Sequence, residues 1–249
     1  MRSLRKIDLI RILFRSFYIQ ASWNYQRLIA LGFCYCLIPS IKKLYSDKEG
    51  RSECLKRHLQ FFNAHPYFAS FALGAVARLE EKKIFEKWES DKPIIVFKDR
   101  LCGPLGAVGD KLFWQTIKPL TALLSVFTSL LLGFLGPIVL FVSYNIPHLY
   151  MRYYGIIRGY EMDFDIVREL SKRKYEKQYQ ILRSIGFVLL GLFIGYIIVF
   201  TGETLDWSMV AFLFLVVSIT WYFVKARKPI SWPIFLNLAL LMVFNIFVP

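Results

Sequence analysis

Apolar residues in this chain form long runs, separated by short stretches rich in lysine and arginine. The longest uncharged run covers residues 119–151, and as one straight helix it would measure about 50 Å. Because the hydrocarbon core of a bilayer is about 30 Å thick, we expect a break at Gly133, Gly136 and Pro137, giving a hairpin or one span with a re-entrant half. Three further uncharged runs are each close to spanning length: residues 184–202, 207–224 and 229–249.

The N-terminal half contains two apolar runs that are too short to cross a bilayer alone. These are residues 28–41, which are interrupted by Pro39, and residues 61–77. Short apolar segments broken by glycine or proline are typical of re-entrant hairpins in transporters. The charged stretch at residues 80–100 lies between the second run and a glycine-rich segment, and we expect it to form a solvated loop or helix.

The N-terminal segment alternates charged and apolar positions with a helical period. Its apolar positions fall on one side of a helix: Leu9, Ile10, Leu13, Phe14 and Phe17. Its polar positions fall on the other side: Asp8, Arg11, Arg15, Tyr18 and Ser22. This pattern predicts an interfacial amphipathic helix with its basic face toward lipid headgroups. Because charges recur inside the apolar run, the segment does not resemble a signal peptide.

Three glycines at three-residue spacing lead directly into a carboxylate near the middle of the chain. Gly103, Gly106 and Gly109, together with Pro104, predict a sharply turned backbone that a ligand or another backbone can approach. The simplest interpretation of Asp110 is a helix N-cap at the end of this turn. In a membrane protein, however, broken backbone beside an acid occurs mainly where it is buried in protein or lines a cavity.

Composition supports a membrane protein and shows a strong excess of positive charge. Of the 249 residues, 56% are hydrophobic, and 32 Lys and Arg against 18 Asp and Glu give a net charge of +14. Such a charge suits nucleic acid or membrane lipids, and the apolar runs favour membrane lipids, so we expect no nucleic acid partner. The four cysteines have no paired spacing and there are only three histidines, so we expect reduced thiols, no metal and no cofactor.

The basic residues also predict the topology of the chain. Residues 152–183 carry many Lys and Arg residues and are expected to form a cytoplasmic loop, which makes the turn at residues 203–206 external. The N-terminus is then cytoplasmic and the C-terminus periplasmic or otherwise external. We therefore predict an all-α integral membrane protein. Residues 1–118 would hold the amphipathic helix and re-entrant hairpins, and residues 119–249 the transmembrane helices.

Five blocks of sequence, taken in order, carry a resemblance to one family of bacterial proteins. They are RSFYIQASWNYQRLIALGFCYCLIPSIKKLY (15–45), RHLQFFNAHPYFASFALG (57–74), GPLGAVGDKLFWQTIKP (103–119), LGPIVLF (135–141) and RYYGIIRGYEMDFDIV (152–167). Together they resemble the IID membrane component of the mannose/fructose/sorbose family of phosphoenolpyruvate-dependent sugar phosphotransferase systems. The C-terminal spans match that family only in character.

The resemblance implies a subunit that joins a IIC protein to form the sugar translocation unit of a hexose permease in the bacterial inner membrane. IIA and IIB components would relay phosphate to the incoming sugar through histidines of their own, so that uptake is coupled to phosphorylation. A IID subunit of such a hetero-oligomer is not the phosphocarrier and supplies no catalytic residue. His58, His65 and His148 are accordingly expected to be structural or interfacial.

The chain departs from the pattern of this family in ways that leave a second function open. Lys111 follows Asp110 where a small residue or proline is usual, Gln26 stands where Glu is common, and Gln115 replaces a usual glycine. These differences suggest as an alternative a divergent IID protein that acts as a membrane scaffold or sugar sensor without transport. An integral-membrane enzyme is disfavoured because the sequence shows no nucleophile arrangement and no metal spacing.

Sugars are recognised by hydrogen bonds to their hydroxyl groups and by an aromatic face under the ring. Three stretches offer such groups, and the candidate substrate-binding residues are Gln20, Ser22, Trp23, Asn24, Asn63, His65, Asp110 and Trp114. Both tryptophans could instead be interfacial anchors. A carboxylate within the membrane costs about 2.5 to 3.5 kcal/mol on insertion scales, so we expect Asp110 to have a partner or a ligand. Lys111 would point elsewhere if both residues are helical.

Overall fold

The computed structural model describes residues 3–170, 173–201, 207–226 and 231–247, and in this part of the chain the regular elements are all helical. This confirms the predicted all-α class. By packing, the chain forms two units, residues 1–190 and residues 191–249. The division at residue 118 that the sequence suggested falls inside an unbroken run of helix.

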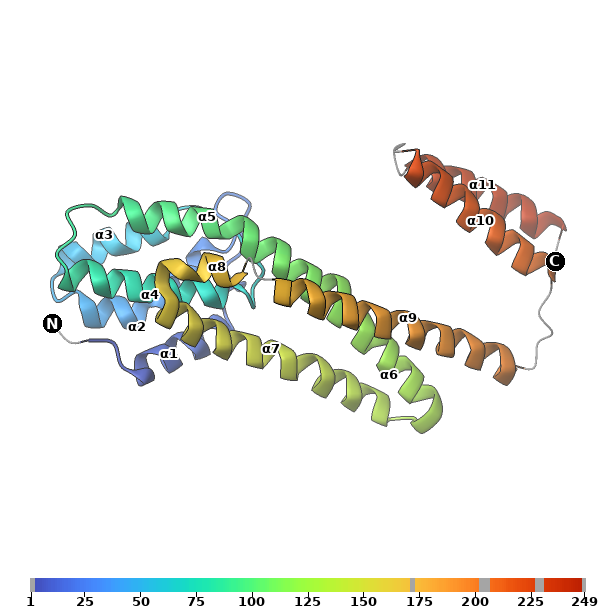
Figure 1. The fold of residues 1–249 in the computed structure, drawn as a ribbon, viewed down its shortest axis with the longest axis horizontal. Coiled ribbons are helices and arrows are strands. Elements are labelled where there is room, and N and C mark those ends of the chain that lie inside the picture. The colour runs from blue at the N-terminus through green and yellow to red at the C-terminus, as the bar shows by residue number, and fades with distance from the viewer. Residues whose placement is uncertain (1–2, 171–172, 202–206, 227–230, 248–249) are drawn as a thin grey trace. The chain divides into compact units, whose positions relative to one another are not determined.

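The first unit is built from eleven successive elements (Figure 1). They are α1 (Lys6–Ser16), α2 (Ala30–Leu44), α3 (Lys48–His58), α4 (Ala69–Phe85), α5 (Lys92–Gly109), the π-helix η1 (Asp110–Ile117), α6 (Lys118–Leu132), α7 (Leu135–Met162), the 3-10 helix η2 (Asp163–Asp165), α8 (Ile166–Leu170) and the first part of α9 (Arg173–Thr201). The last three elements, with the end of α7, occupy most of the stretch 152–183 that was predicted as a loop.

Two helix–loop–helix segments form the N-terminal half of this unit. Residues 17–29 join α1 to α2, and residues 59–68 join α3 to α4. The two short apolar runs of the sequence are therefore α2 and the beginning of α4, each of which starts directly after one of these loops. Their placement as re-entrant hairpins in a bilayer stays a prediction.

The predicted turn at the three glycines is wrong. The chain stays helical from α5 through η1 into α6, so that Lys92–Leu132 form one run of 41 residues that is long and apolar enough to cross a membrane. A Cβ atom at Gly103 or Gly106 would meet nothing within 4 Å, so neither glycine serves a turn or a close contact. Pro104 lies inside the helix. Asp110 consequently is not an N-cap.

The predicted break in the long uncharged run is confirmed as a helical hairpin. Helix α6 ends at Leu132, and Gly133 has a φ of 59°, a left-handed conformation that glycine adopts without strain. The Ser125 hydroxyl donates a 2.9 Å hydrogen bond to the Gly136 carbonyl and so holds the two helices together. Large apolar side chains near the tip are exposed, Phe134 by 77% and Phe141 by 70%, as expected for a lipid-facing surface.

Helices α4 and α7 make the most extensive helix–helix contact among the described residues, and they meet through small residues. A Cβ atom at Gly159 would overlap the carbonyl oxygen of Phe71, and one at Gly74 would overlap the carbonyl oxygen of Ile156. Gly155 lies one turn before Gly159, so α7 presents a small-xxx-small pattern that lets two backbones approach.

Replacing Gly159 by alanine should therefore destabilise the protein by about 1–3 kcal/mol, because the overlap is with backbone that cannot rotate away. The matched control is Gly103→Ala, at a helical position with open space around it. This control should leave stability unchanged or raise it by up to about 1 kcal/mol. Thermal unfolding of the two purified variants in detergent compares them, and equal midpoints would contradict the close-packing argument.

The N-terminal helix is present, but one polar residue lies on the wrong side for the prediction. Asp8 is buried and forms an ion pair with Lys43 of α2, whereas it was expected to face the lipid headgroups. The exposed side of α1, together with Phe17 directly after its last residue, carries a stripe of large apolar residues: Ile7, Ile10, Phe14 and Phe17. This stripe follows helical spacing and fits a helix at a membrane surface, and that placement stays a prediction.

The charged stretch at residues 80–100 is helical at both ends and mostly exposed or half-buried, as predicted, but three of its charged residues are buried. Glu80 and Glu81 belong to α4 and are 2% and 1% exposed, and Lys98 of α5 is 1% exposed. Glu81 accepts hydrogen bonds from the Ser3 hydroxyl and the Leu4 amide, each at 2.7 Å, so it anchors the start of the chain to α4.

The second unit contains the end of α9 and the helices α10 (Trp207–Lys225) and α11 (Ser231–Phe247). These correspond to the three predicted C-terminal spans. Asn237 of α11 donates a 2.9 Å hydrogen bond to the Thr220 hydroxyl of α10. Residues 202–206 and 227–230, on which the predicted external and internal turns fall, lie outside the described residues.

Candidate functional site

The two loops that carry most of the predicted sugar-binding residues are bonded to one another. The amide of Ile29 donates to the carbonyl of Phe62 at 3.1 Å, and the amide of Phe62 donates to the carbonyl of Arg27 at 3.5 Å. Such backbone pairing is expected in buried loops, because polar groups of the main chain need a partner there. The loops 17–29 and 59–68 therefore form one connected surface.

In the first loop, the predicted residues divide into two kinds. The Asn24 side chain accepts from the Arg27 amide at 2.9 Å and donates to the Ser22 carbonyl at 3.3 Å, so it shapes the loop. Gln20 is exposed and makes no side-chain hydrogen bond within the described residues. Trp23 is 47% exposed and packs edge-on against Tyr25, with 4.8 Å between the ring centres.

In the second loop, His65 is buried against the helical run that contains the glycines. Its ring centre lies 4.9 Å from that of Trp114 and 5.4 Å from that of Phe113, both in η1. A Cβ atom at Gly109 would overlap the His65 side chain, so this glycine is the one that a close approach requires. Asn63 is exposed in the same loop. The structure thus brings His65, Gly109 and Trp114 together.

The approach occurs at a π-helix, which is rare and often found at functional sites. Within η1, the Thr116 hydroxyl donates to the Lys111 carbonyl at 2.8 Å. Asp110 begins this segment and is partly buried, and its carboxylate has no hydrogen bond or ion pair to the described residues. Lys111 points to a different partner, Glu176 of α9, at 2.7 Å, as expected for adjacent helical residues.

Helix α7 supplies a third wall that the sequence did not indicate. The hydroxyls of Tyr67 and Tyr144 lie 3.0 Å apart, and the rings of Tyr67 and His148 have centres 4.4 Å apart. The Arg152 guanidinium lies 5.0 Å from the Tyr67 ring centre. Tyr144 and His148 lie within the uncharged run at residues 119–151, and Arg152 follows it directly, so the sequence pattern suggests that all three face lipid. The only indication of a polar site in the sequence is that a histidine and an arginine occur there.

Together these contacts form an aromatic and polar cluster, defined as His65, Tyr67, Trp114, Tyr144 and His148. It combines ring faces with histidine and hydroxyl groups, and Asp110 begins the π-helix that contains Trp114, four residues before it. Hydroxyl-rich ligands such as sugars need this combination of donors, acceptors and apolar faces. The side chain of Trp114 is 48% exposed, so one face of the cluster is open at the surface of this chain.

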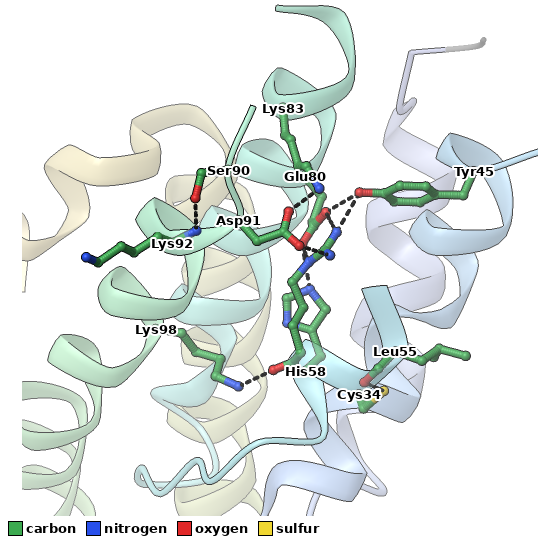
Figure 2. Close-up of polar contacts among 11 residues, drawn as sticks. Cys34, Tyr45, Leu55, His58, Glu80, Lys83, Ser90, Asp91, Lys92 and Lys98 are labelled. Carbon is green, nitrogen blue, oxygen red and sulfur yellow. Dashed lines mark hydrogen bonds and ion pairs between the residues drawn. The ribbon is translucent and has the colours of Figure 1, made fainter. Parts of the chain in front are cut away.

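A second polar group lies where the C-terminal ends of α2 and α3 meet the second half of α4 (Figure 2). Arg57 donates to both oxygens of Glu80, at 2.7 and 2.8 Å, and to Asp91 at 2.7 Å. Tyr45 donates to Glu80 at 2.6 Å, and His58 bonds the same carboxylate at 2.8 Å. This Arg57–Glu80 network joins four helices or their ends, and sequence reasoning missed it because its members are far apart in the chain.

Within this network, the buried charges of Arg57 and Glu80 compensate each other. Burial alone would raise the pKa of Glu80, but the hydrogen bonds from Arg57 and His58 outweigh burial and hold this pKa well below its usual range. Burial lowers the pKa of His58, so the neutral ring donates from Nε2 to Glu80. The tautomer assignment follows from this hydrogen bond.

Cys54, His58 and Glu80 offer ligand atoms within 4.8 Å of one another, which is the spacing of a metal site. Both oxygens of Glu80 are already bonded to Arg57, however, and a guanidinium beside the site repels a cation. The arrangement is therefore suited to joining helices and not to binding a metal. Cys54 is buried and forms no disulfide with the other three cysteines.

Comparison with known proteins shows the family to which the chain belongs. The pattern of the PTS system mannose/fructose/sorbose family IID component matches residues 3–247. The mannose-specific EIID component of Escherichia coli K12 is 36% identical over 194 residues, which cover 78% of this chain and 67% of that protein. The fructose permease IID component of Bacillus subtilis is 35% identical over 193 residues, covering 78% of this chain and 68% of its own length. This chain thus spans about two thirds of the length of these relatives.

Solved structures agree with the sequence comparison. A structure of the mannose transporter ManYZ in complex with microcin E492 matches with a TM-score of 0.64 and 35% identity, over 77% of this chain and 70% of that one. A structure described as a membrane protein matches with a TM-score of 0.71 over the same shares. By its sequence pattern, its relatives and its fold, this chain belongs to the family of IID membrane components of the mannose/fructose/sorbose phosphotransferase systems.

Proposed function

We propose that this chain forms, with a IIC subunit, the translocation unit of a hexose permease whose IIA and IIB components phosphorylate the incoming sugar. The observation that carries the proposal is the contact of the second loop, which is bonded to the first, with a π-helix that begins at Asp110. The carboxylate of Asp110 has no hydrogen bond or ion pair within the described residues. Family membership supplies the class of substrate. Similarity to a structure described as the transporter ManYZ supports assembly with a second membrane subunit.

The depth of the loops supports their role as re-entrant segments. The part of α7 at residues 135–151 has no charged residue and measures about 25 Å, close to the thickness of a bilayer core. Tyr67 of the second loop contacts Tyr144 and His148 within this stretch. The loops would therefore lie below the bilayer surface, where transporters bind their substrates beside discontinuous helices.

The distribution of lysines supports a cytoplasmic location for the end of the helix bundle that lies opposite the two loops. The turns at residues 45–47 and 86–91 are flanked by lysines, and residues 152–183 return the chain to the same end. By the positive-inside rule this end is cytoplasmic, which places the Gly133 tip and the C-terminus outside. The IIB protein would then meet the complex on this basic side.

A IIC partner would also cover aromatic residues that are exposed at the loops. Tyr18 is 62% exposed and Tyr25 is 90% exposed, although both lie in the first loop next to backbone that lipid cannot satisfy. A IIC subunit packed against this loop would cover the tyrosines and supply hydrogen-bond partners for the backbone. The alternative function, a scaffold or sensor without transport, loses part of its basis because the unusual Lys111 is directed to Glu176.

Replacing Asp110 by asparagine tests the substrate role. A charge-assisted hydrogen bond is roughly twice as strong as a neutral one, so we expect the affinity for mannose to fall by tens-fold if this carboxylate binds the sugar. Mannose uptake by cells that express the chain with its IIC subunit gives the affinity, and co-purification with IIC shows whether the complex still assembles. The matched control is Asp99→Asn, an exposed carboxylate of α5. Wild-type affinity for mannose, fructose and sorbose in an assembled Asp110→Asn complex would refute the role.

A further inference from the structure

The C-terminal ends of α1 and α3 are each capped by a buried basic side chain that comes from a long helix. Lys98 of α5 donates from Nζ to the carbonyl oxygens of Arg57 at 3.1 Å and of Gln60 at 3.3 Å. Figure 2 shows Lys98 reaching from its helix toward the end of α3. Arg152 of α7 donates from Nη1 to the carbonyl oxygen of Ser16 and, at 3.1 Å, to the hydroxyl of Ser16.

Neither basic residue forms an ion pair with a carboxylate among the described residues. Lys98 is 1% exposed and Arg152 is 4% exposed. A buried charge is costly unless something compensates it. Here the compensation comes from the partial negative charge at a helix C-terminus, and for Arg152 also from the ring of Phe17 at 5.2 Å.

Both capped ends lead directly into the loops of the candidate site. Helix α1 ends at Ser16, immediately before residues 17–29, and α3 ends at His58, immediately before residues 59–68. We infer that Lys98 and Arg152 are positioning residues, tethered cations that fix the two loops in the arrangement that binds sugar. This inference rests on the proposed function.

The chemistry of these ends suggests how the inference can be tested. Backbone carbonyls at the ends of broken helices are the groups with which many transporters hold a free cation. In this chain the carbonyls of Arg57 and Gln60 are occupied by an ammonium group that is covalently attached to α5. Truncation of Lys98 to alanine removes three carbons and the ammonium, which together have the shape of n-propylammonium. A free n-propylammonium ion should then bind in the vacated space.

The experiment uses the full chain together with its membrane partner, as Lys98→Ala, as Lys98→Met and as the unchanged protein. Hydrogen exchange of the backbone at residues 59–68 reports the order of the loop, and mannose binding reports the site. We expect Lys98→Ala and Lys98→Met each to speed loop exchange and to weaken mannose binding at least tenfold. Addition of n-propylammonium chloride should restore both properties to Lys98→Ala but not to Lys98→Met, whose side chain fills the space.

Sodium chloride and tetramethylammonium chloride at equal ionic strength are the controls for the added cation, and neither should rescue. Lys92→Ala is the control for the substitution, because Lys92 is an exposed lysine on the same helix. Unchanged loop exchange in Lys98→Met would overturn the inference, as would equal rescue by tetramethylammonium. If Lys98→Ala cannot be purified, Arg152→Gln against Arg152→Lys makes the same comparison at the first loop, with the lysine variant expected to keep the loop ordered. If the unchanged protein binds no mannose, the proposed function fails, while loop exchange still decides the role of Lys98.

Discussion

Replacing Glu80 by glutamine is expected to lower the free energy of unfolding by about 3–5 kcal/mol, the usual cost of removing one partner from a buried ion pair. Glutamine has nearly the same shape as glutamate, so the loss comes from charge: the buried Arg57 guanidinium no longer has a carboxylate on Glu80 to compensate it, and the hydrogen bond from His58 becomes weaker. Thermal unfolding of the purified chain measures the effect. The matched control is Glu89→Gln, an exposed glutamate in the turn after α4, which should change stability by less than about 0.5 kcal/mol.

The same network should make stability depend on pH. The pKa of Glu80 is lowered in the folded chain by Arg57 and His58, so its contribution is fully present above the unfolded-state pKa of about 4.3 and is lost as the pH falls below it. The pKa of His58 is lowered by burial, so stability also falls as the pH drops below about 6.5, where only the unfolded histidine binds a proton. The Glu80→Gln variant should lose stability less steeply below pH 5 than the unchanged chain. Parallel pH profiles would show that Glu80 is not held ionised.

Replacing Gly109 by alanine is expected to reduce mannose affinity by more than tenfold, because the new methyl group would overlap the His65 side chain and displace the second loop. A misplacement of about 1 Å can cost two orders of magnitude at a site that depends on orientation. The matched control is Gly106→Ala, one turn earlier in the same helix, where a Cβ atom meets nothing within 4 Å.

Mannose binding and co-purification with IIC should be measured for both glycine variants. A Gly109→Ala complex that assembles and binds mannose as well as Gly106→Ala would show that close contact between the loop and the helix is not needed. A loss of binding in both variants would indicate a helix effect and not the contact with His65.

The sequence predicted those features that depend on local physics. The helical class, the break at Gly133 and the divergent directions of Asp110 and Lys111 follow from apolar run lengths, backbone conformation and helical geometry. His65 and Trp114 were both proposed as sugar ligands, and the structure places their rings together. The sequence did not predict that Gly109 allows this contact, because the contact depends on the tertiary structure.

The failures have a common cause, which is that burial is decided by partners distant in sequence. The Lys- and Glu-rich pattern around Glu80 resembles a solvated surface, and the groups that stabilise the buried carboxylate, chiefly Arg57 and His58, lie more than 20 residues earlier. Glycine spacing likewise cannot distinguish a turn from a helix with an open face, and the structure shows the latter at Gly103 and Gly106. His148 and Arg152 carried no pattern that linked them to the loops.

The π-helix η1 has a mechanical consequence for the rest of the chain. A π-helix closes each backbone ring one residue later than an α-helix does, so the same eight residues contain less rotation than α-helical winding would give them. If these residues rewound into α-helical form, α6 would turn about its own axis relative to α5, and the hairpin that it forms with α7 would turn with it. Since Trp114 lies inside η1, a ligand that binds there and changes the helical winding would rotate α6 about its axis.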